Sequence, residues 1–206
     1  MEPEMLEDYL IECCSPTLAS LKAGSLFNYI YASEKEPSVP LDMWNDRFAA
    51  AGLQLCLLRK TDHSALIYVY RISHLRTLLE DPEIRAFLQS YGYVFPEKAG
   101  ALSPAGCGDD KWLQACLAHL SSRIRGCGAD MAFPHEIGVF LGYPLYDVKC
   151  FIRDHGRNYK RIGTWKVYGD ENSAVRTFDR FSKCKDVYTR LWRSGRRSIL
   201  QLTVAG

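Results

Sequence analysis

Hydrophobic positions along the chain recur mainly at the three-to-four-residue spacing of amphipathic helices. This spacing predicts helices over 4–13, 40–48, 71–80, 81–92 and 111–124, and a long helix capped by Asp170 or Asn172. Local signals mark several ends. Pro40 begins one helix and Gly52 ends it, while Asp81-Pro82 combines a capping side chain with a first-turn proline. The pattern therefore predicts a chain rich in helix.

Apolar runs of strand length are fewer. Residues 53–59 and 65–70 form two such runs around a short polar connection, and they predict a β-hairpin. Further strands are expected at 161–168 and 198–204, with the long helix between them as a crossover. These elements indicate an α+β fold in which one domain, 1–206, packs helices on a small sheet of about four strands. Segment 93–110, rich in Pro, Gly and Ala, is expected to be a mobile surface loop.

The stretch from Phe133 to Ile152 has the densest set of residues that start or end helices. Pro134 and Pro144 each suit a first helical turn, where the missing N–H costs nothing. Gly142 and Gly156 suit the left-handed residue that ends a helix. Together they predict two helices joined by a tight turn, a helix-turn-helix-like unit at 134–155. A strand remains possible for 135–141, because its apolar residues also alternate.

The helix pair does not have the composition of a nucleic-acid reader. A recognition helix presents polar side chains to base edges. Here the second helix opens with Pro144-Leu-Tyr-Asp147, which is apolar and then acidic. A plain structural helix pair is the simpler interpretation, and nucleic acid is not the expected partner.

Composition adds few constraints. Apolar residues make up 47% of the chain and charged residues 24%, as in ordinary globular proteins. No apolar run is long enough to span a membrane, and the acidic start does not resemble a signal peptide, so a cytoplasmic protein is expected. The eight cysteines are scattered without a C-x-x-C pair. Cys116 and His119 could share a helical face, but idle thiols are expected and no metal site is predicted.

Charge is divided unevenly along the chain. Residues 1–110 carry 9 basic and 16 acidic groups, whereas residues 111–206 carry 17 and 8. Many of the basic residues crowd the long final helix and the segment after it, among them Arg176, Arg180 and Arg193. Such a helix could attract phosphates or an acidic partner, although a solvated face is the more common explanation.

Three motif blocks carry a family resemblance. They are Cys14-x-Pro-Thr-Leu-Ala, then Phe-Pro-His-Glu-Ile-Gly-Val-Phe-Leu-Gly-Tyr-Pro-Leu-x-Asp-Val at 133–148, then Gly163-x-Trp-Lys-Val-Tyr168. In these blocks the chain resembles the bacterial domain-of-unknown-function family 3793, of clostridial type, although Ser15 stands where alanine is expected. The resemblance implies a bacterial cytosolic protein and brings no activity or cofactor with it.

The same blocks suggest a cysteine-dependent hydrolase or transferase. If Pro16 breaks the first helix and Ser15 caps a second one, the helix dipole would favour the Cys14 thiolate. His135 would then act as base, with Glu136 beside it.

A small-ligand module, with a pocket between segments 14–22 and 133–148, is the preferred hypothesis. Thr17 and Lys22 would suit a small anionic ligand, and Tyr143 and Trp165 could stack on a ring. The remaining expected ligand contacts are Asp147 and Lys166. A third hypothesis is a protein- or nucleic-acid-interaction module that uses the helix pair and the basic final helix.

Overall fold

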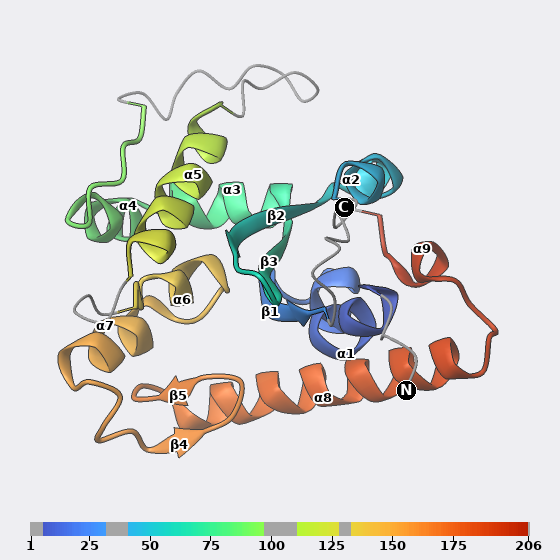
Figure 1. The fold of residues 1–206 in the computed structure, drawn as a ribbon. Coiled ribbons are helices and arrows are strands. Elements are labelled where there is room, and N and C mark those ends of the chain that lie inside the picture. The colour runs from blue at the N-terminus through green and yellow to red at the C-terminus, as the bar shows by residue number, and fades with distance from the viewer. Residues whose placement is uncertain (1–5, 32–40, 97–110, 128–132, 206) are drawn as a thin grey trace.

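The computed structural model describes residues 6–31, 41–96, 111–127 and 133–205. Within these ranges the chain forms helices, two sets of antiparallel strands and a short 3-10 turn (Figure 1). In chain order the elements are α1 (Leu6–Leu18), β1 (Gly24–Ile30), α2 (Leu41–Phe48), η1 (Ala49–Ala51), β2 (Leu53–Lys60), β3 (Ser64–Arg71), α3 (Ile72–Glu80), α4 (Pro82–Gln89), α5 (Lys111–Gly126), α6 (Ile137–Phe140), α7 (Leu145–Arg153), β4 (Arg161–Ile162), β5 (Lys166–Val167), α8 (Glu171–Arg193) and α9 (Ile199–Leu202).

The central sheet has three antiparallel strands in the order β1-β3-β2. The hairpin predicted at 53–59 and 65–70 is confirmed as β2 and β3. Strand β3 holds the central position, which suits its β-branched and aromatic run from Ile67 to Tyr70. On its other side β1 pairs so that Phe27 lies opposite Ile67.

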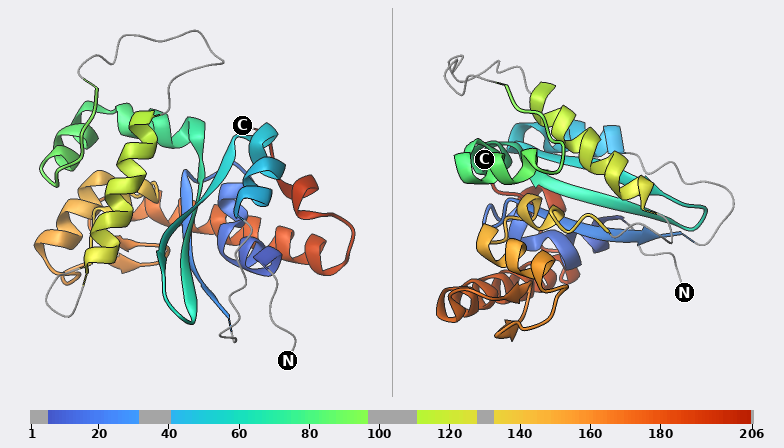
Figure 2. Two further views of the ribbon diagram at one scale, coloured as in Figure 1. Left: turned by 45° about the horizontal axis from the view of Figure 1, so that its top comes forward. Right: turned by 90° about the vertical axis from the view of Figure 1, so that its left-hand side faces the viewer.

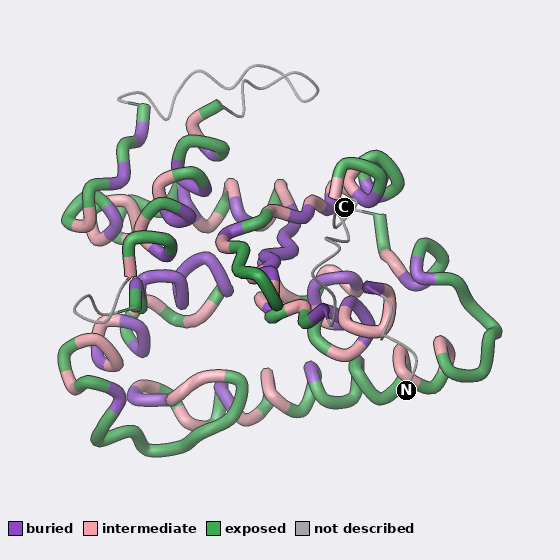
Figure 3. Tube along the Cα trace, in the orientation of Figure 1, coloured by how far each residue is buried: buried purple, intermediate pink, exposed green. Residues whose placement is uncertain are grey.

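The sheet separates two hydrophobic cores (Figure 3). Because side chains alternate along β3, Tyr68 and Tyr70 pack with α3, α4, α5 and the α6–α7 pair on one face. Ile67 and Val69 pack with α1, α2 and α9 on the other. Figure 2 shows α5 on one side of the sheet and α1 on the other, with α8 lying beyond α1. The α+β class and the small sheet are therefore confirmed.

The buried side chain of Arg71 joins the sheet to the ends of two helical segments. Its Nε donates to the carbonyl of Thr17 at 2.8 Å, its Nη1 to that of Ala51 at 2.9 Å, and its Nη2 to that of Leu18. Thr17 and Leu18 lie in the last turn of α1, where carbonyls lack helical partners and a cation is favoured. Arg71 thus adds donors to a helix end whose carbonyls also accept the backbone N–H groups of Ser20 and Val204.

The first helix differs from the prediction. Pro16 does not break it: α1 continues through Pro16 to Leu18, and no second helix is capped by Ser15. The buried face of α1, which includes Leu10, Cys14 and Leu18, packs against the sheet and against α8 and outweighs the local preference of proline. Strand β1, which follows, was not predicted.

The C-terminal strand predictions also need correction. Residues 161–168 form not one strand but the small β4–β5 hairpin, separate from the central sheet. The segment predicted as a strand at 198–204 contains helix α9, which Ser198 caps and Gln201 completes as a capping box. No parallel crossover exists among the described strands, because every pairing is antiparallel.

Other local predictions hold. Asp81 accepts bonds from the N–H groups of Glu83 and Ile84, and Asp170 caps α8. Of the expected loop 93–110, residues 97–110 lie outside the described part. In the preceding part, Tyr93 and Phe95 are buried in the first core, whereas Val94 between them is exposed. None of the described helices is long and apolar enough to cross a membrane.

Candidate functional site

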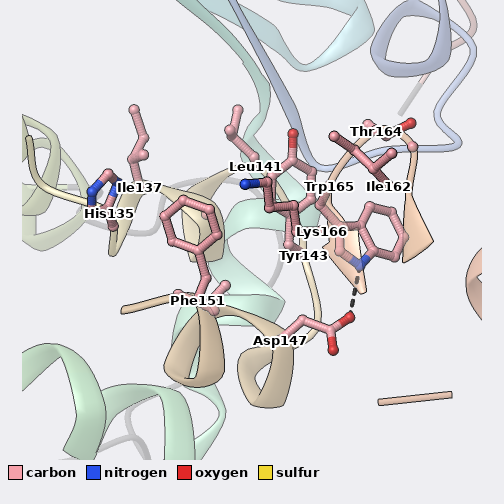
Figure 4. A pocket seen from close by; sticks show the side chains of 13 residues that line it. His135, Ile137, Leu141, Tyr143, Asp147, Phe151, Ile162, Thr164, Trp165 and Lys166 are labelled. Carbon is pink, nitrogen blue, oxygen red and sulfur yellow. Dashed lines mark hydrogen bonds between the residues drawn. The ribbon is translucent and has the colours of Figure 1, made fainter. Parts of the chain in front are cut away.

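A cavity of about 300 Å³ lies between the α6–α7 pair and the β4–β5 hairpin (Figure 4). Its lining is largely aromatic and aliphatic, with a few polar groups. The lining residues are His135, Ile137, Gly138, Leu141, Tyr143, Asp147, Val148, Phe151, Ile162, Gly163, Thr164, Trp165 and Lys166. Concave, mainly apolar sites with a few placed polar groups are typical of small-molecule binding.

The first wall is the predicted helix pair, with a shorter first helix than expected. Residues 135–141 form a turn and the four-residue helix α6, not a strand. Gly142 and Gly156 have φ values of +73° and +70°, the left-handed geometry predicted for these helix ends. Gly138 lets the helices touch, since a Cβ there would come within 2.8 Å of Val148. The wall is thus set by close contact.

The second wall is the β4–β5 hairpin, which rests on α8. A Cβ on Gly163 would lie 2.2 Å from the ring of Phe178, so only glycine allows this approach. Trp165 meets the same ring edge-on at 4.5 Å between centroids and lies 5.2 Å from the Tyr143 ring. The hairpin is therefore fixed on its helix side while its other side faces the cavity.

Asp147 joins the two walls. Its Oδ2 accepts the indole N–H of Trp165 at 2.7 Å, and its Oδ1 accepts the backbone N–H groups of Tyr168 and Gly169 at 2.9 and 2.8 Å. The carboxylate is buried and stands in the first turn of α7, where negative charge is favoured. Asp147 lines the cavity as predicted, but these three bonds already use its oxygens.

Lys166 lies in the same wall and is half-buried. Its Nζ donates to the carbonyl of Gly156 at 2.7 Å and stands 5.6 Å from the ring centre of Phe151 (Figure 4). No carboxylate of the described ranges forms an ion pair with it. Tyr143 contributes a hydroxyl whose pKa burial raises to about 12, so this group is a neutral donor at physiological pH.

His135 lines the cavity and is exposed at its outer edge. Its ring lies 5.9 Å from that of Phe133 and 4.9 Å from that of Phe151, measured between centroids. Partial burial lowers the pKa of His135; Glu136 opposes this shift, and His155 adds to it. The imidazole is therefore neutral at pH 7, with burial as the main cause.

Glu136 does not act with His135 at the cavity. Its buried carboxylate forms an ion pair with Arg123 of α5 and accepts the Tyr93 hydroxyl at 3.4 Å. The sequence reasoning missed Arg123, because nothing in its local pattern separates it from the other basic residues of an amphipathic helix. The pair anchors the start of the 133–148 segment to α5.

The structure does not bring Cys14 to the cavity. The thiol lies inside α1 and not at a helix start, and it is fully buried in the second core. Burial raises the pKa of the Cys14 thiol well above its ordinary value, which opposes the thiolate that a nucleophile needs. Thr17 is also buried, and its hydroxyl pairs with that of Ser25 at 2.8 Å. Neither residue lines the space that His135 reaches.

Lys22 lies beside the 133–148 segment but does not line the cavity. Its Nζ stands 5.3 Å from the centre of the Tyr143 ring. It lines a second hollow, with Ser25, Thr164 and Lys185. The predicted pocket is thus partly corrected: segment 133–148 supplies one wall, but the β4–β5 hairpin, not segment 14–22, supplies the other.

The helix pair offers little to a nucleic acid. Lys149 pairs with Glu83 at 2.7 Å and Arg153 with its neighbour Asp154 at 2.7 Å. Along α8, Arg176, Arg180 and Arg193 are exposed. In the described part of the chain, no group of three or more His, Cys, Asp or Glu side chains is placed to hold a metal.

Fold and site together define an α+β protein with a three-stranded antiparallel sheet and a small, mainly apolar cavity between the α6–α7 pair and the β4–β5 hairpin. The chain belongs to the family described as "Protein of unknown function (DUF3793)", whose profile matches residues 10–203, nearly the whole chain. The match confirms the resemblance seen in the three motif blocks. No curated protein and no solved structure is significantly similar to this chain.

Proposed function

We propose that this chain is a small-ligand-binding protein and that its ligand occupies the cavity between the α6–α7 pair and the β4–β5 hairpin. The observation that carries the proposal is a hollow of about 300 Å³ lined by Tyr143, Phe151 and Trp165. Aromatic rings supply large apolar contact areas in defined orientations. A compact molecule with a ring or branched apolar body fits these walls.

Preformed geometry supports the proposal. Asp147 hydrogen-bonds the helix pair to the hairpin. Gly138 and Gly163 are packed so closely that neither position has room for a side chain, so both walls are tightly packed. A site built this way does not have to order its walls when the ligand arrives, which lowers the cost of binding. The expectation of a bacterial cytoplasmic protein, which comes from the family resemblance, stays part of the proposal.

The other two hypotheses gain no support from the contacts. A nucleophilic role for Cys14 would need an accessible thiolate near His135, whereas the thiol is buried in another core. Recognition of nucleic-acid bases by the helix pair would need free polar side chains on α7, but its two basic residues already form ion pairs. We therefore propose neither, and the helix-turn-helix-like unit is assigned the role of a cavity wall.

A fragment panel with a matched pair of variants tests this function. Ile162 lines the cavity and Ile30 lies in β1, and both are 63% exposed, so neither is needed for the core. Fragments that raise the melting temperature of the unmodified protein should bind the Ile162→Ala variant several-fold more weakly, since each lost methylene contact is worth about 0.8 kcal/mol. The Ile30→Ala variant should bind them normally.

Two results would overturn the proposal. One is a broad panel in which no fragment shifts the melting temperature or shows contact by ligand-observed NMR. The other is a set of hits whose affinity is the same in both variants, because such fragments bind elsewhere on the molecule.

A further inference from the structure

The polar groups around the cavity differ in how far they are already used. The charged acceptor, the carboxylate of Asp147, receives three N–H bonds and is buried. One of those donors is the indole N–H of Trp165, which is therefore used as well. A ligand that needed a carboxylate partner in this wall would have to break the contact that holds helix pair and hairpin together.

Donors remain available. The Lys166 ammonium carries three N–H groups, and one hydrogen bond, to the carbonyl of Gly156, accounts for only one of them. Its charge has no carboxylate partner within the described ranges and lies 4.7 Å from the ring centre of Tyr159 and 5.6 Å from that of Phe151. The Tyr143 hydroxyl likewise has no hydrogen-bond partner in the part of the chain that the structure describes.

The two negative groups closest in sequence to the cavity are compensated. Asp147 has its three N–H donors, and Glu136 has the guanidinium of Arg123. Lys166 also lines the cavity, and no carboxylate of the described residues neutralises its positive charge. A half-buried cation without a counter-ion favours an anion, because each partner offsets the desolvation of the other.

On the basis of the proposed function, we infer that the ligand is an acid: an apolar, ring-sized body with one carboxylate or similar acidic group that binds Lys166 and the Tyr143 hydroxyl. The rings of Phe151 and Trp165 contact the apolar body, and the acidic group lies between Lys166 of the hairpin and Tyr143 of the helix pair. The inference specifies the class of ligand for this cavity and predicts that the ligand is negatively charged.

Three probes of nearly equal shape test the charge. These are 3-phenylpropionate, 3-phenylpropionamide and 3-phenylpropylamine, which share a ring and spacer and end in an anion, a neutral group and a cation. Titrations by ligand-observed NMR near neutral pH and at low salt should show the carboxylate binding about tenfold more tightly than the amide, with the amine weakest. Added salt should weaken the carboxylate and leave the amide unchanged.

Two lysine variants show which residue causes the preference for the carboxylate. Lys160 in the same segment donates to the carbonyl of Gly169 at 2.8 Å, the same kind of bond that Lys166 makes to Gly156, but it does not line the cavity. The Lys166→Met variant should lose the preference for the carboxylate and still bind the amide, whereas Lys160→Met should keep the preference. If Lys166→Met does not fold, the salt titration of the unmodified protein decides.

Equal binding of the three probes, a preference for the amine, or a carboxylate preference unchanged by Lys166→Met would overturn the inference and leave the proposed cavity function standing. Failure of all three probes to bind at millimolar concentration would also overturn it. The proposed function itself fails if no fragment of the broad panel binds or if the hits bind the Ile162→Ala and Ile30→Ala variants equally, so the two ideas can be refuted separately.

Discussion

At the scale of single residues, the sequence identified many of the side chains around the cavity but not what they do there. Tyr143, Trp165 and Lys166 were expected to contact a ligand, and all three line the cavity. Asp147 lines it too, but its oxygens accept N–H groups of residues just before and just after β5. Such roles depend on which groups lie within about 3 Å, and residue type alone does not determine that.

Glu136 is a second residue whose partner could not be predicted from residue type. The sequence places it next to His135, yet its carboxylate pairs with Arg123, 13 residues earlier on another helix. Consecutive residues point in different directions in a turn or helix, so neighbours in sequence seldom act on one another. Cys14 and His135 failed to meet for the related reason that α1 continues through Pro16.

Lys22 yields a prediction about stability and pH. Burial lowers the pKa of its ammonium from 10.5 to about 8, so the charged form is disfavoured in the folded chain. Lys22→Met should raise the free energy of unfolding at pH 7 by about 3 kcal/mol, since the acid constant changes by between two and three factors of ten and each is worth about 1.4 kcal/mol. The gain should shrink from about pH 8 to pH 10.5, because the unfolded chain still binds the proton there and the native protein regains stability.

Urea denaturation across that pH range measures the difference between variant and unmodified protein. Lys183 is exposed on α8 and has no ion pair with any described residue, so Lys183→Met should show no comparable gain. A Lys22→Met variant whose advantage stays constant up to pH 10.5 would contradict the assigned cause.

At the scale of elements, the sequence predicted helix ends correctly where the signal involves only neighbouring residues. Asp81 and Asp170 cap the helices predicted for them, because a cap needs only the next few backbone N–H groups. The signal at 198–204 was also local but was missed: Ser198-x-x-Gln201 is a capping box, and it outweighs the apolar run read as a strand. In contrast, β1 exists because it pairs with β3, 40 residues away between Phe27 and Ile67.

The β4–β5 hairpin gives an element-scale prediction. Gly163→Ala would place a Cβ 2.2 Å from the Phe178 ring, so the hairpin must shift away from α8. We expect a loss of about 1–3 kcal/mol in unfolding free energy, as for overpacking, and weaker fragment binding. Gly126→Ala, at the end of α5 with open space around it, should cost nothing.

A double-mutant cycle checks the cause. If Phe178 is the obstacle, Gly163→Ala combined with Phe178→Leu should be less destabilised than the two single changes predict together, because the smaller side chain makes room for the new methyl group. Strict additivity would refute the contact as the reason for glycine.

At the scale of the whole molecule, stability depends on contacts that span the sequence. Trp192 of α8 donates to Asp8 of α1 at 2.8 Å, and Arg71 joins the sheet to the end of α1 and to η1. Arg71→Met should cost about 3 kcal/mol, because it removes three hydrogen bonds worth about 1 kcal/mol each, although Thr17 and Leu18 still accept the backbone N–H groups of Ser20 and Val204.

Chemical denaturation measures this loss. The control is Arg190→Met, which removes an exposed arginine of α8 with no ion pair in the described chain and should change stability by less than about 0.5 kcal/mol. Equal midpoints for the two variants would show that the carbonyls are satisfied in another way.

The sequence by itself determined the helices with amphipathic faces, the β2–β3 hairpin, the caps at Asp81 and Asp170 and the left-handed ends at Gly142 and Gly156. These features depend on residues within a few positions of each other. Only the tertiary structure decided that α1 passes through Pro16, that Glu136 pairs with Arg123, and that the β4–β5 hairpin completes the cavity. Those outcomes depend on burial and on contacts between distant segments, whose free energies can exceed a local preference worth only a few kcal/mol.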